Sequence, residues 1–216
     1  MNLVVLIVYN YENDDLYVHH DIILPAFPIC FECIGYGVNS QNESVNYVAV
    51  GDMTKDICIW DLDLVNTLEP VAKLIGHKDS VLDLSWNQLV TQTIASGSVD
   101  HTVSLWDLNT HKNVKSFSKF KSNVQSLDFH PNKAQTLLIG DCNGAVSIGD
   151  CQSGAFKKWT LANEEIEKVI WNHYNPYLCF AGTSNGSIYC FDVRNEKKFI
   201  YTFKAHNQLI SGLSLR

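Results

Sequence analysis

Short apolar runs bounded by turn-forming residues recur along this chain. Four follow one another at residues 81–86, 93–98, 102–106 and 113–117, and all are rich in β-branched and aromatic residues. Runs of this length and composition predict strands, and no long stretch carries the period expected of a helix. Residues 57–60 are apolar without interruption, which is typical of a strand in a sheet that is covered on both faces.

Two markers repeat along the chain with one period. An apolar run ends before an aspartate at four places, and the aspartates are 46, 43 and 42 residues apart: Trp60 with Asp61, Trp106 with Asp107, Gly149 with Asp150, and Phe191 with Asp192. The large residues that close the first run of each unit recur at intervals of 43, 42 and 44: Trp86, Phe129, Trp171 and Leu215. A period of roughly 40 to 45 residues with four short strands in each unit predicts a β-propeller.

These units define the predicted organisation, which is an all-β fold and a single domain. Four complete four-stranded blades occupy residues 26–75, 76–118, 119–161 and 162–204. Residues 1–25 supply two strands of a preceding blade, and residues 205–216 supply the first strand of a further blade. We therefore expect an incomplete ring that forms part of a longer propeller. The alternative, a five-bladed ring closed by the two partial units, would lack one strand.

Turn-forming residues separate the second and third strands of each unit: Asp100 and His101, Asn143 and Gly144, Asn185 and Gly186. Such pairs predict two-residue hairpin turns with positive φ at both positions. The aspartates after the third strands are expected to cap the next turn by accepting a backbone N–H: Asp61, Asp107, Asp150 and Asp192. Where Gly149 replaces tryptophan, we expect Trp159 to fill part of the vacated volume.

Composition and charge limit the kinds of partner that the chain is expected to bind, and they agree with the predicted fold. The chain has 216 residues, of which 46% are hydrophobic, and its net charge is −7. Residues 1–110 carry −12 and residues 111–216 carry +5, so indiscriminate binding to phosphate is disfavoured while the basic half remains suited to an acidic partner. No apolar run approaches the roughly 18 residues of a membrane span, so no membrane partner is expected. The seven scattered cysteines favour reduced thiols over a disulfide framework.

The repeated residues resemble the WD-repeat β-propeller family over nearly the whole chain. Within it, the sequences GDMT at 51–54, IWDLD at 59–63, GH at 76–77 and VLDLSWN at 81–87 are similar to the periodic tryptophan protein 1 family. Residues 17–22, 129–131, 135–137, 171–173, 205–206 and 210–213 extend this likeness. The resemblance implies a nuclear and nucleolar protein of ribosome biogenesis, active in processing the large-subunit precursor rRNA and associated with chromatin. The acidic N-terminal region and the further blades of that family have no counterpart here.

His77, Asp100 and a serine, either Ser96 or Ser98, have the residue types of a hydrolase triad. No Gly-x-Ser-x-Gly motif accompanies them. In the family that the chain resembles, the same positions form a structural hydrogen-bond network with a tryptophan, here Trp106. Linked polar groups stabilise a blade because each buried member left unpaired would cost about 1–3 kcal/mol. We favour the structural interpretation and expect no catalytic residue.

Metal and cofactor motifs are weak. Cys30 and Cys33 have the spacing of a zinc-ligand pair, but no second pair accompanies them. In a strand, residues three apart point to opposite faces, and the adjacent His19 and His20 would be split in the same way. No glycine-rich nucleotide-binding motif is present. We therefore expect neither a metal site nor a cofactor.

The expected function is a non-catalytic scaffold for protein–protein interaction in ribosome biogenesis, with ribosome-assembly factors as partners and RNA or chromatin bound indirectly. The alternative is an adaptor that presents a substrate or a histone tail to a chromatin-modifying or ubiquitin-ligase complex. Loops on a rigid scaffold carry function, so the expected partner face is the one that carries the connections from fourth to first strands and from second to third strands. Its expected exposed residues are Lys78, Asp79, Lys121, Asn123, Glu164 and Glu165.

Overall fold

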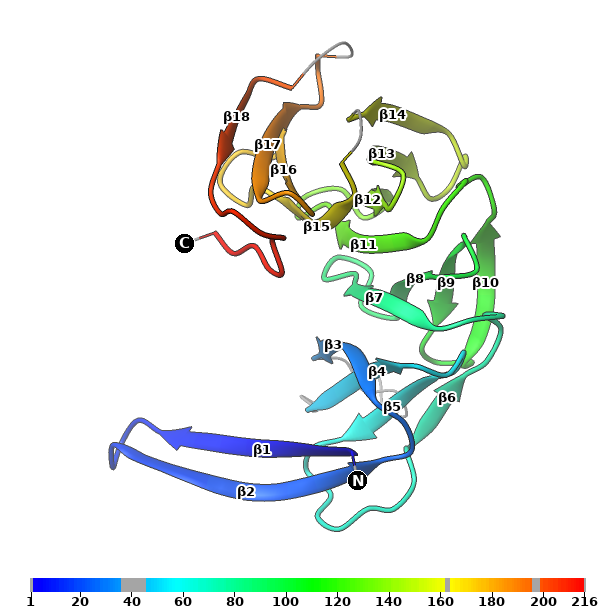
Figure 1. Cartoon of the computed structure of the whole chain (residues 1–216). Coiled ribbons are helices and arrows are strands. Elements are labelled where there is room, and N and C mark those ends of the chain that lie inside the picture. Colours follow the sequence, from blue (N-terminus) through cyan, green and yellow to red (C-terminus); the bar gives the residue numbers. More distant parts are fainter. Residues whose placement is uncertain (1, 36–45, 162–163, 196–198, 216) are drawn as a thin grey trace.

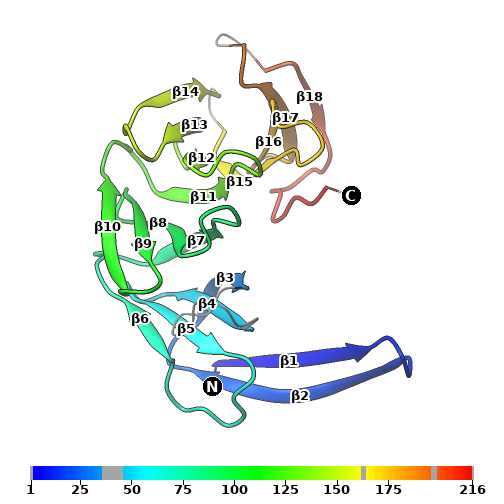
Figure 2. The same ribbon diagram turned by 180° about the vertical axis from the view of Figure 1, so that it is seen from behind.

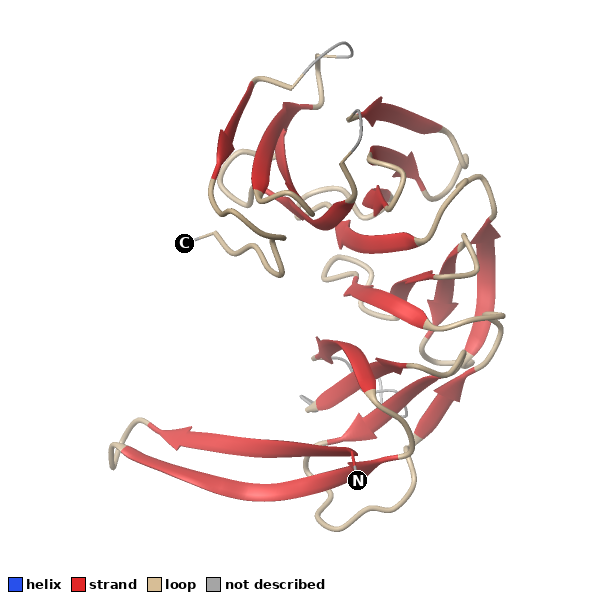
Figure 3. Cartoon of the chain, viewed as in Figure 1, coloured by secondary structure: helices blue, strands red, loops and turns tan. Residues whose placement is uncertain are grey.

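The fold is an open arc of β-sheets. The computed structural model describes residues 2–35, 46–161, 164–195 and 199–215, and this part contains strands and loops but no helix (Figure 3). The strands form four four-stranded sheets and one two-stranded hairpin, which follow one another around an arc (Figures 1 and 2). The predicted all-β, incomplete propeller is confirmed. No helix in the described residues is long and apolar enough to cross a membrane.

Each four-stranded sheet lies within one of the predicted blade ranges. The hairpin consists of β1 (Asn2–Asn10) and β2 (Asp15–Leu24). The first sheet holds β3 (Pro28–Ile34), β4 (Tyr47–Asp52), β5 (Ile57–Asp61) and β6 (Ala72–Leu74), and the second holds β7 (Val81–Trp86), β8 (Thr93–Ser98), β9 (Val103–Asp107) and β10 (Lys112–Phe117). The third holds β11 (Val124–Phe129), β12 (Thr136–Asp141), β13 (Ala145–Asp150) and β14 (Phe156–Thr160), and the fourth holds β15 (Ile166–Trp171), β16 (Leu178–Thr183), β17 (Ser187–Asp192) and β18 (Tyr201–Lys204).

The first strand of each sheet lies on the inside of the arc and the fourth on the outside (Figure 1). Neighbouring sheets pack face to face, with β3 beside β7, β7 beside β11, and β11 beside β15. Every residue of β4 is buried because neighbours cover both faces of its sheet. The uninterrupted apolar runs in the sequence have this physical cause.

Glycines at one position of each second strand allow this close packing. A Cβ at Gly97 would lie 2.6 Å from Cγ1 of Val124, and a Cβ at Gly140 would lie 2.5 Å from Cγ2 of Ile166. The same relation joins Gly51 to Val81 and Gly182 to Ile210. Each glycine therefore accommodates the first inner residue of the next unit. The four glycines are 46, 43 and 42 residues apart, which is the spacing of the repeated aspartates.

The turns between second and third strands differ from the prediction. In the three turns for which this was predicted, only the last residue has positive φ: His101, Gly144 and Gly186. The N–H of Gly144 donates to the carbonyl of Asp141, and that of Gly186 to Thr183. These are three-residue loops in which a type I turn ends in a left-handed residue. Such a loop needs only one positive φ, so the predicted two-residue turn was wrong.

Two further predictions about packing were wrong. Phe156, not Trp159, covers Gly149: a Cβ at Gly149 would lie 2.4 Å from the Phe156 ring, and the two residues are paired across β13 and β14. The segment expected to be a first strand at 210–215 forms no strand. Among the described residues no strand lies beside it to complete a ladder, although the N–H of Ile210 donates to the carbonyl of Thr183 at 3.2 Å.

Candidate functional site

The second sheet contains a buried polar network around His77. The Nδ1 atom of His77 lies 2.9 Å from a carboxylate oxygen of Asp100, and its Nε2 atom lies 2.6 Å from the hydroxyl of Ser96. The indole N–H of Trp106 donates to the same hydroxyl at 2.7 Å. Because a carboxylate only accepts, Nδ1 carries the imidazole proton and the Ser96 hydroxyl donates to Nε2. Four of the five predicted network residues are thus brought together.

The fifth residue, Ser98, lies beside the network. Its hydroxyl donates to the carbonyl of Asp79 at 3.1 Å and accepts the N–H of Asp100 at 3.1 Å. It therefore shapes the turn that positions Asp100. Ser96 and Ser98 are two residues apart and point to the same side of β8, so position along the strand decides between them. Ser98 ends β8 beside the turn, whereas Ser96 lies two residues further in and reaches the indole of Trp106.

Asp100 is held as an anion by several donors. Burial alone would raise the pKa of its carboxyl, but hydrogen bonds from Thr102, from the N–H of Lys78 and from His77 outweigh burial and hold the pKa below its ordinary value. The N–H of Lys78 donates at 2.9 Å and the hydroxyl of Thr102 at 2.6 Å. One carboxylate thus joins the loop before β7 to the turn after β8.

The network is unsuited to nucleophilic catalysis. Ser96 is fully buried and His77 is 3% exposed, so a substrate has no access to the hydroxyl. The hydroxyl also accepts the Trp106 N–H, which reduces its nucleophilicity. All the polar groups that resemble a triad are engaged in holding strands of one blade together.

Only the second sheet has a serine at this position. The strand register places Val50, Ile139 and Ala181 at the equivalent positions of the other sheets. Trp60 in the first sheet accordingly has an indole N–H with no partner among the described residues. The hydrogen-bond network around His77 is therefore a feature of the second sheet, and apolar residues pack at the equivalent position of the other three sheets.

The four repeated aspartates adopt one arrangement. Each carboxylate accepts the N–H of the residue two positions later, at distances of 2.9, 3.0, 2.7 and 2.9 Å for Asp61, Asp107, Asp150 and Asp192. Arg194 also donates to Asp192, which lowers the pKa of that carboxyl to about 2. This is the geometry of a side chain that closes a turn.

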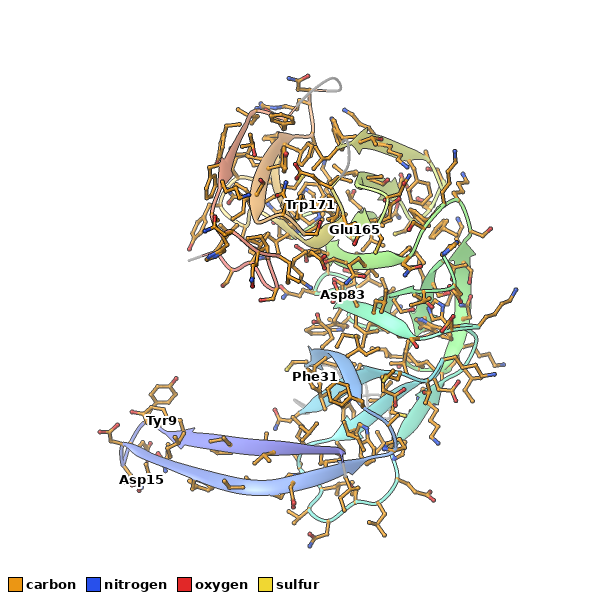
Figure 4. The ribbon with its side chains drawn as sticks, viewed as in Figure 1. Tyr9, Asp15, Phe31, Asp83, Glu165 and Trp171 are labelled. Atoms are coloured by element: carbon orange, nitrogen blue, oxygen red, sulfur yellow. The ribbon has the colours of Figure 1, made fainter. Side chains whose placement is uncertain are left out.

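A second set of hydrogen bonds joins the inner strands of neighbouring sheets. The carboxylates of Glu32, Asp83 and Asp128 accept the backbone N–H groups of Trp86, Leu127 and Trp171 at 2.8, 2.8 and 2.6 Å. The hydroxyls of Ser85 and Ser126 accept from Phe129 and Val169 at 3.0 and 3.1 Å. We call these five contacts the inner ladder. Figure 4 labels Asp83 and Trp171 on the inner side of the arc.

The inner ladder surrounds a pocket of about 230 Å³ whose walls include Glu32, Asp128 and Lys168. Lys168 pairs with Asp83 at 2.8 Å and bridges the second and fourth sheets. Burial raises the pKa of Glu32 and that of Asp128 to about 7 each. This polar pocket was not predicted, because the contacts around it join residues 43 to 85 positions apart.

The predicted partner face is only partly exposed. Lys78, Asp79, Lys121 and Glu165 are exposed, whereas Asn123 and Glu164 are half-buried. Glu164 accepts the hydroxyl of Tyr189 at 2.8 Å, and the carbonyl of Asn123 accepts the N–H of Cys142 at 3.0 Å. The expectation that all six are exposed was wrong for these two, because each lies against the neighbouring second-to-third-strand hairpin.

The residues with metal-like spacing do not form a cluster. Cys30 is buried and Cys33 is exposed, on opposite faces of β3. His19 and His20, which were expected on opposite faces, lie together, with their Nδ1 atoms 2.6 Å apart. A bulge in β2 causes this, because the register with β1 shifts between Leu6 and Ile7. The described residues hold no group of three or more metal-ligating side chains.

The sheet geometry and the repeated aspartates define a WD-repeat β-propeller chain. The family model "WD domain, G-beta repeat" matches residues 68–107, which include the His77 network. The crystal structure of the Myceliophteria thermophila Cps50 (Swd1) beta-propeller domain superposes with a TM-score of 0.72 over 89% of this chain and 60% of that one, at 20% sequence identity. This likeness shows the fold.

Within this class the chain belongs with the periodic tryptophan protein 1 family. It is 37% identical to the Periodic tryptophan protein 1 homolog of Drosophila melanogaster over 95% of its own length and 48% of that protein. It is also 25% identical to the Ribosome biogenesis protein WDR12 homolog of Anopheles gambiae over 82% of its length and 45% of that protein. The chain thus spans about half the length of these relatives. The resemblance predicted from the sequence is confirmed.

Proposed function

We propose that this chain is part of a non-catalytic scaffold that binds ribosome-assembly factors in the nucleolus during processing of the large-subunit precursor rRNA. The non-catalytic assignment rests on the burial of Ser96 and His77, whose polar side-chain atoms form hydrogen bonds within the blade. Similarity to the Drosophila protein along 95% of the chain and to a protein named for ribosome biogenesis supports the pathway.

The partner-binding loops in this proposal lie on one rim of the arc. They precede the inner strands and join the second strands to the third, so they project from the same end of each sheet. A rigid array of sheets holds these loops in fixed relation, which is what a scaffold requires. Association with RNA or chromatin is then indirect, through the bound proteins.

Affinity capture of the protein from cells, followed by mass spectrometry, tests this function. The variant replaces the four exposed loop residues by alanine: Lys78, Asp79, Lys121 and Glu165. The matched control replaces two lysines, one aspartate and one glutamate on the opposite rim, all exposed: Lys112, Lys133, Asp63 and Glu69. We expect nucleolar assembly factors with the unmodified chain and the control, and their loss with the variant. Capture of histone-modifying or ubiquitin-ligase subunits instead would favour the adaptor and overturn the proposal.

A further inference from the structure

The outer edge of the second sheet is rich in lysine. The segment that contains β10 and its flanking loops, residues 108–120, has three lysines and no aspartate or glutamate: Lys112, Lys115 and Lys119. The matching segment of the first sheet, residues 62–77, has one lysine, one aspartate and one glutamate. The first and third sheets pack on the two faces of the second sheet, so β10 meets solvent along its outer edge (Figures 1 and 2).

Contacts with the third sheet hold two of these ammonium groups in place. The Nζ atom of Lys115 donates to the carbonyls of Cys151 and Gln152 at 3.1 and 2.7 Å. The Nζ atom of Lys119 donates to the carbonyl of Gly154 at 2.8 Å. An ammonium group has three donor hydrogens, and these contacts use two in Lys115 and one in Lys119. The remaining hydrogens are therefore positioned to bond an anion before it arrives.

The backbone of β10 has a second side that can pair with another strand. β10 is the last strand of its sheet, so one side of its backbone bonds β9, and no strand of the described residues pairs with the other side. Val114, in the middle of β10, is 69% exposed. An extended peptide can add to such an edge through backbone hydrogen bonds, with its side chains beside those of the edge strand. Between paired strands, opposite charges stabilise the contact and like charges destabilise it.

We infer that an extended acidic segment of a partner protein adds to β10 as a fifth strand, with its carboxylates on the ammonium groups of Lys112, Lys115 and Lys119. Asp107 and Asp150 lie near this edge, but their carboxylates accept N–H groups of their own turns. The lysines disfavour the β10 edge of a second copy, which carries the same charges. An RNA strand could contact the lysines but has no peptide backbone to pair with β10. None of the four loop residues replaced in the capture experiment takes part, so this contact can fail while the proposed function holds.

Fluorescence anisotropy with a labelled peptide tests this inference. The probe is a peptide of about ten residues in which glutamate alternates with threonine, a residue that favours strands. We expect the unmodified chain to bind it, and we expect binding to weaken as salt rises from about 50 to about 300 mM. The same peptide with every backbone nitrogen methylated keeps the charge but has no N–H, so it should bind at least about tenfold more weakly. A peptide with glutamine in place of glutamate keeps the N–H groups but lacks the charge, and it should also bind weakly.

Charge reversal locates the contact on the chain. The double variant Lys112→Glu with Lys119→Glu should weaken binding of the acidic peptide by about tenfold or more. The control, Lys55→Glu with Lys73→Glu, makes the same change of charge at two exposed lysines of the first sheet and should bind normally. Circular dichroism melting verifies that each variant folds. No binding by the unmodified chain, equal binding of the methylated peptide, equal losses in the two variants, or displacement of the peptide by an equal concentration of oligouridylate would each overturn the inference.

Discussion

Ser96→Ala removes the hydroxyl that links two buried groups. The indole N–H of Trp106 and the Nε2 atom of His77 both bond this hydroxyl, at 2.7 and 2.6 Å, and both residues are almost fully buried. Each buried polar group left without a partner costs about 1–3 kcal/mol. The two groups share one partner and relax together, so we expect the variant to lose about 2–4 kcal/mol of unfolding free energy.

Urea unfolding followed by tryptophan fluorescence and circular dichroism measures this loss. The control is Ser104→Ala. Ser104 is also buried, but among the described residues its hydroxyl bonds only that of Ser116, at 3.0 Å, and Ser116 is exposed to water. The control should lose less than about 1 kcal/mol. Equal losses in the two variants would refute the network as a stabilising unit.

A double-mutant cycle isolates the coupling. Trp106→Phe removes the indole donor, so adding Ser96→Ala to that variant should cost less than it does in the unmodified chain, by about 1 kcal/mol. Purely additive losses would mean that the two residues contribute independently.

Three further predictions follow from packing and charge. Gly97→Ala forces a Cβ to 2.6 Å from Val124 and should lower the free energy of unfolding in urea by about 1–3 kcal/mol. Gly212→Ala is the control, because the space around Gly212 is open, and it should cost almost nothing. Equal effects of the two substitutions would contradict the close approach of Gly97 to Val124. Phe156→Ala uncovers Gly149 and should lower stability by about 2–3 kcal/mol because Phe156 is only half-buried, and a neutral result would show that the site is not packed. Burial raises the pKa of Glu32 to about 7 from 4.5, so between these pH values Glu32 is protonated in the folded state and ionised in the unfolded state. The contribution of protonated Glu32 to folding stability is therefore fully present below pH 4.5 and is lost as the pH rises through 7. Glu32→Gln should therefore flatten the decline of melting temperature between pH 5 and 8, and an unchanged profile would contradict the raised pKa.

The repeat made the architecture predictable because two markers of different kinds share one period. The aspartates end the third strands and the large residues end the first strands, so together they divide each unit into its parts. A third marker, the glycine of each second strand, has the same spacing but was overlooked. Its meaning depends on contact with the next unit, such as that between Gly97 and Val124, and the repeat spacing was the signal that could have revealed it.

The site was predicted less completely, for reasons of register. Residue types and order suggested His77, Asp100, Trp106 and one of two serines. Both serines point to the same side of β8, so choosing Ser96 requires the register that places it beside Trp106. The half-burial of Glu164 depends on Tyr189 from another hairpin. Phe156 covers Gly149 because β14 pairs with β13 in one register, and a shift by one residue would turn its ring away.

The inner ladder has a direction. In each of its five contacts the side-chain acceptor belongs to the earlier sheet and the backbone donor to the later one. For example, Asp83 accepts the N–H of Leu127, and Asp128 accepts the N–H of Trp171. A chain made on the ribosome emerges from its N-terminus, so every newly synthesised sheet meets acceptors that are already in place. The sheets can therefore fold one after another during translation. Each new sheet packs on the sheet that has already formed, and none has to wait for the ring to close.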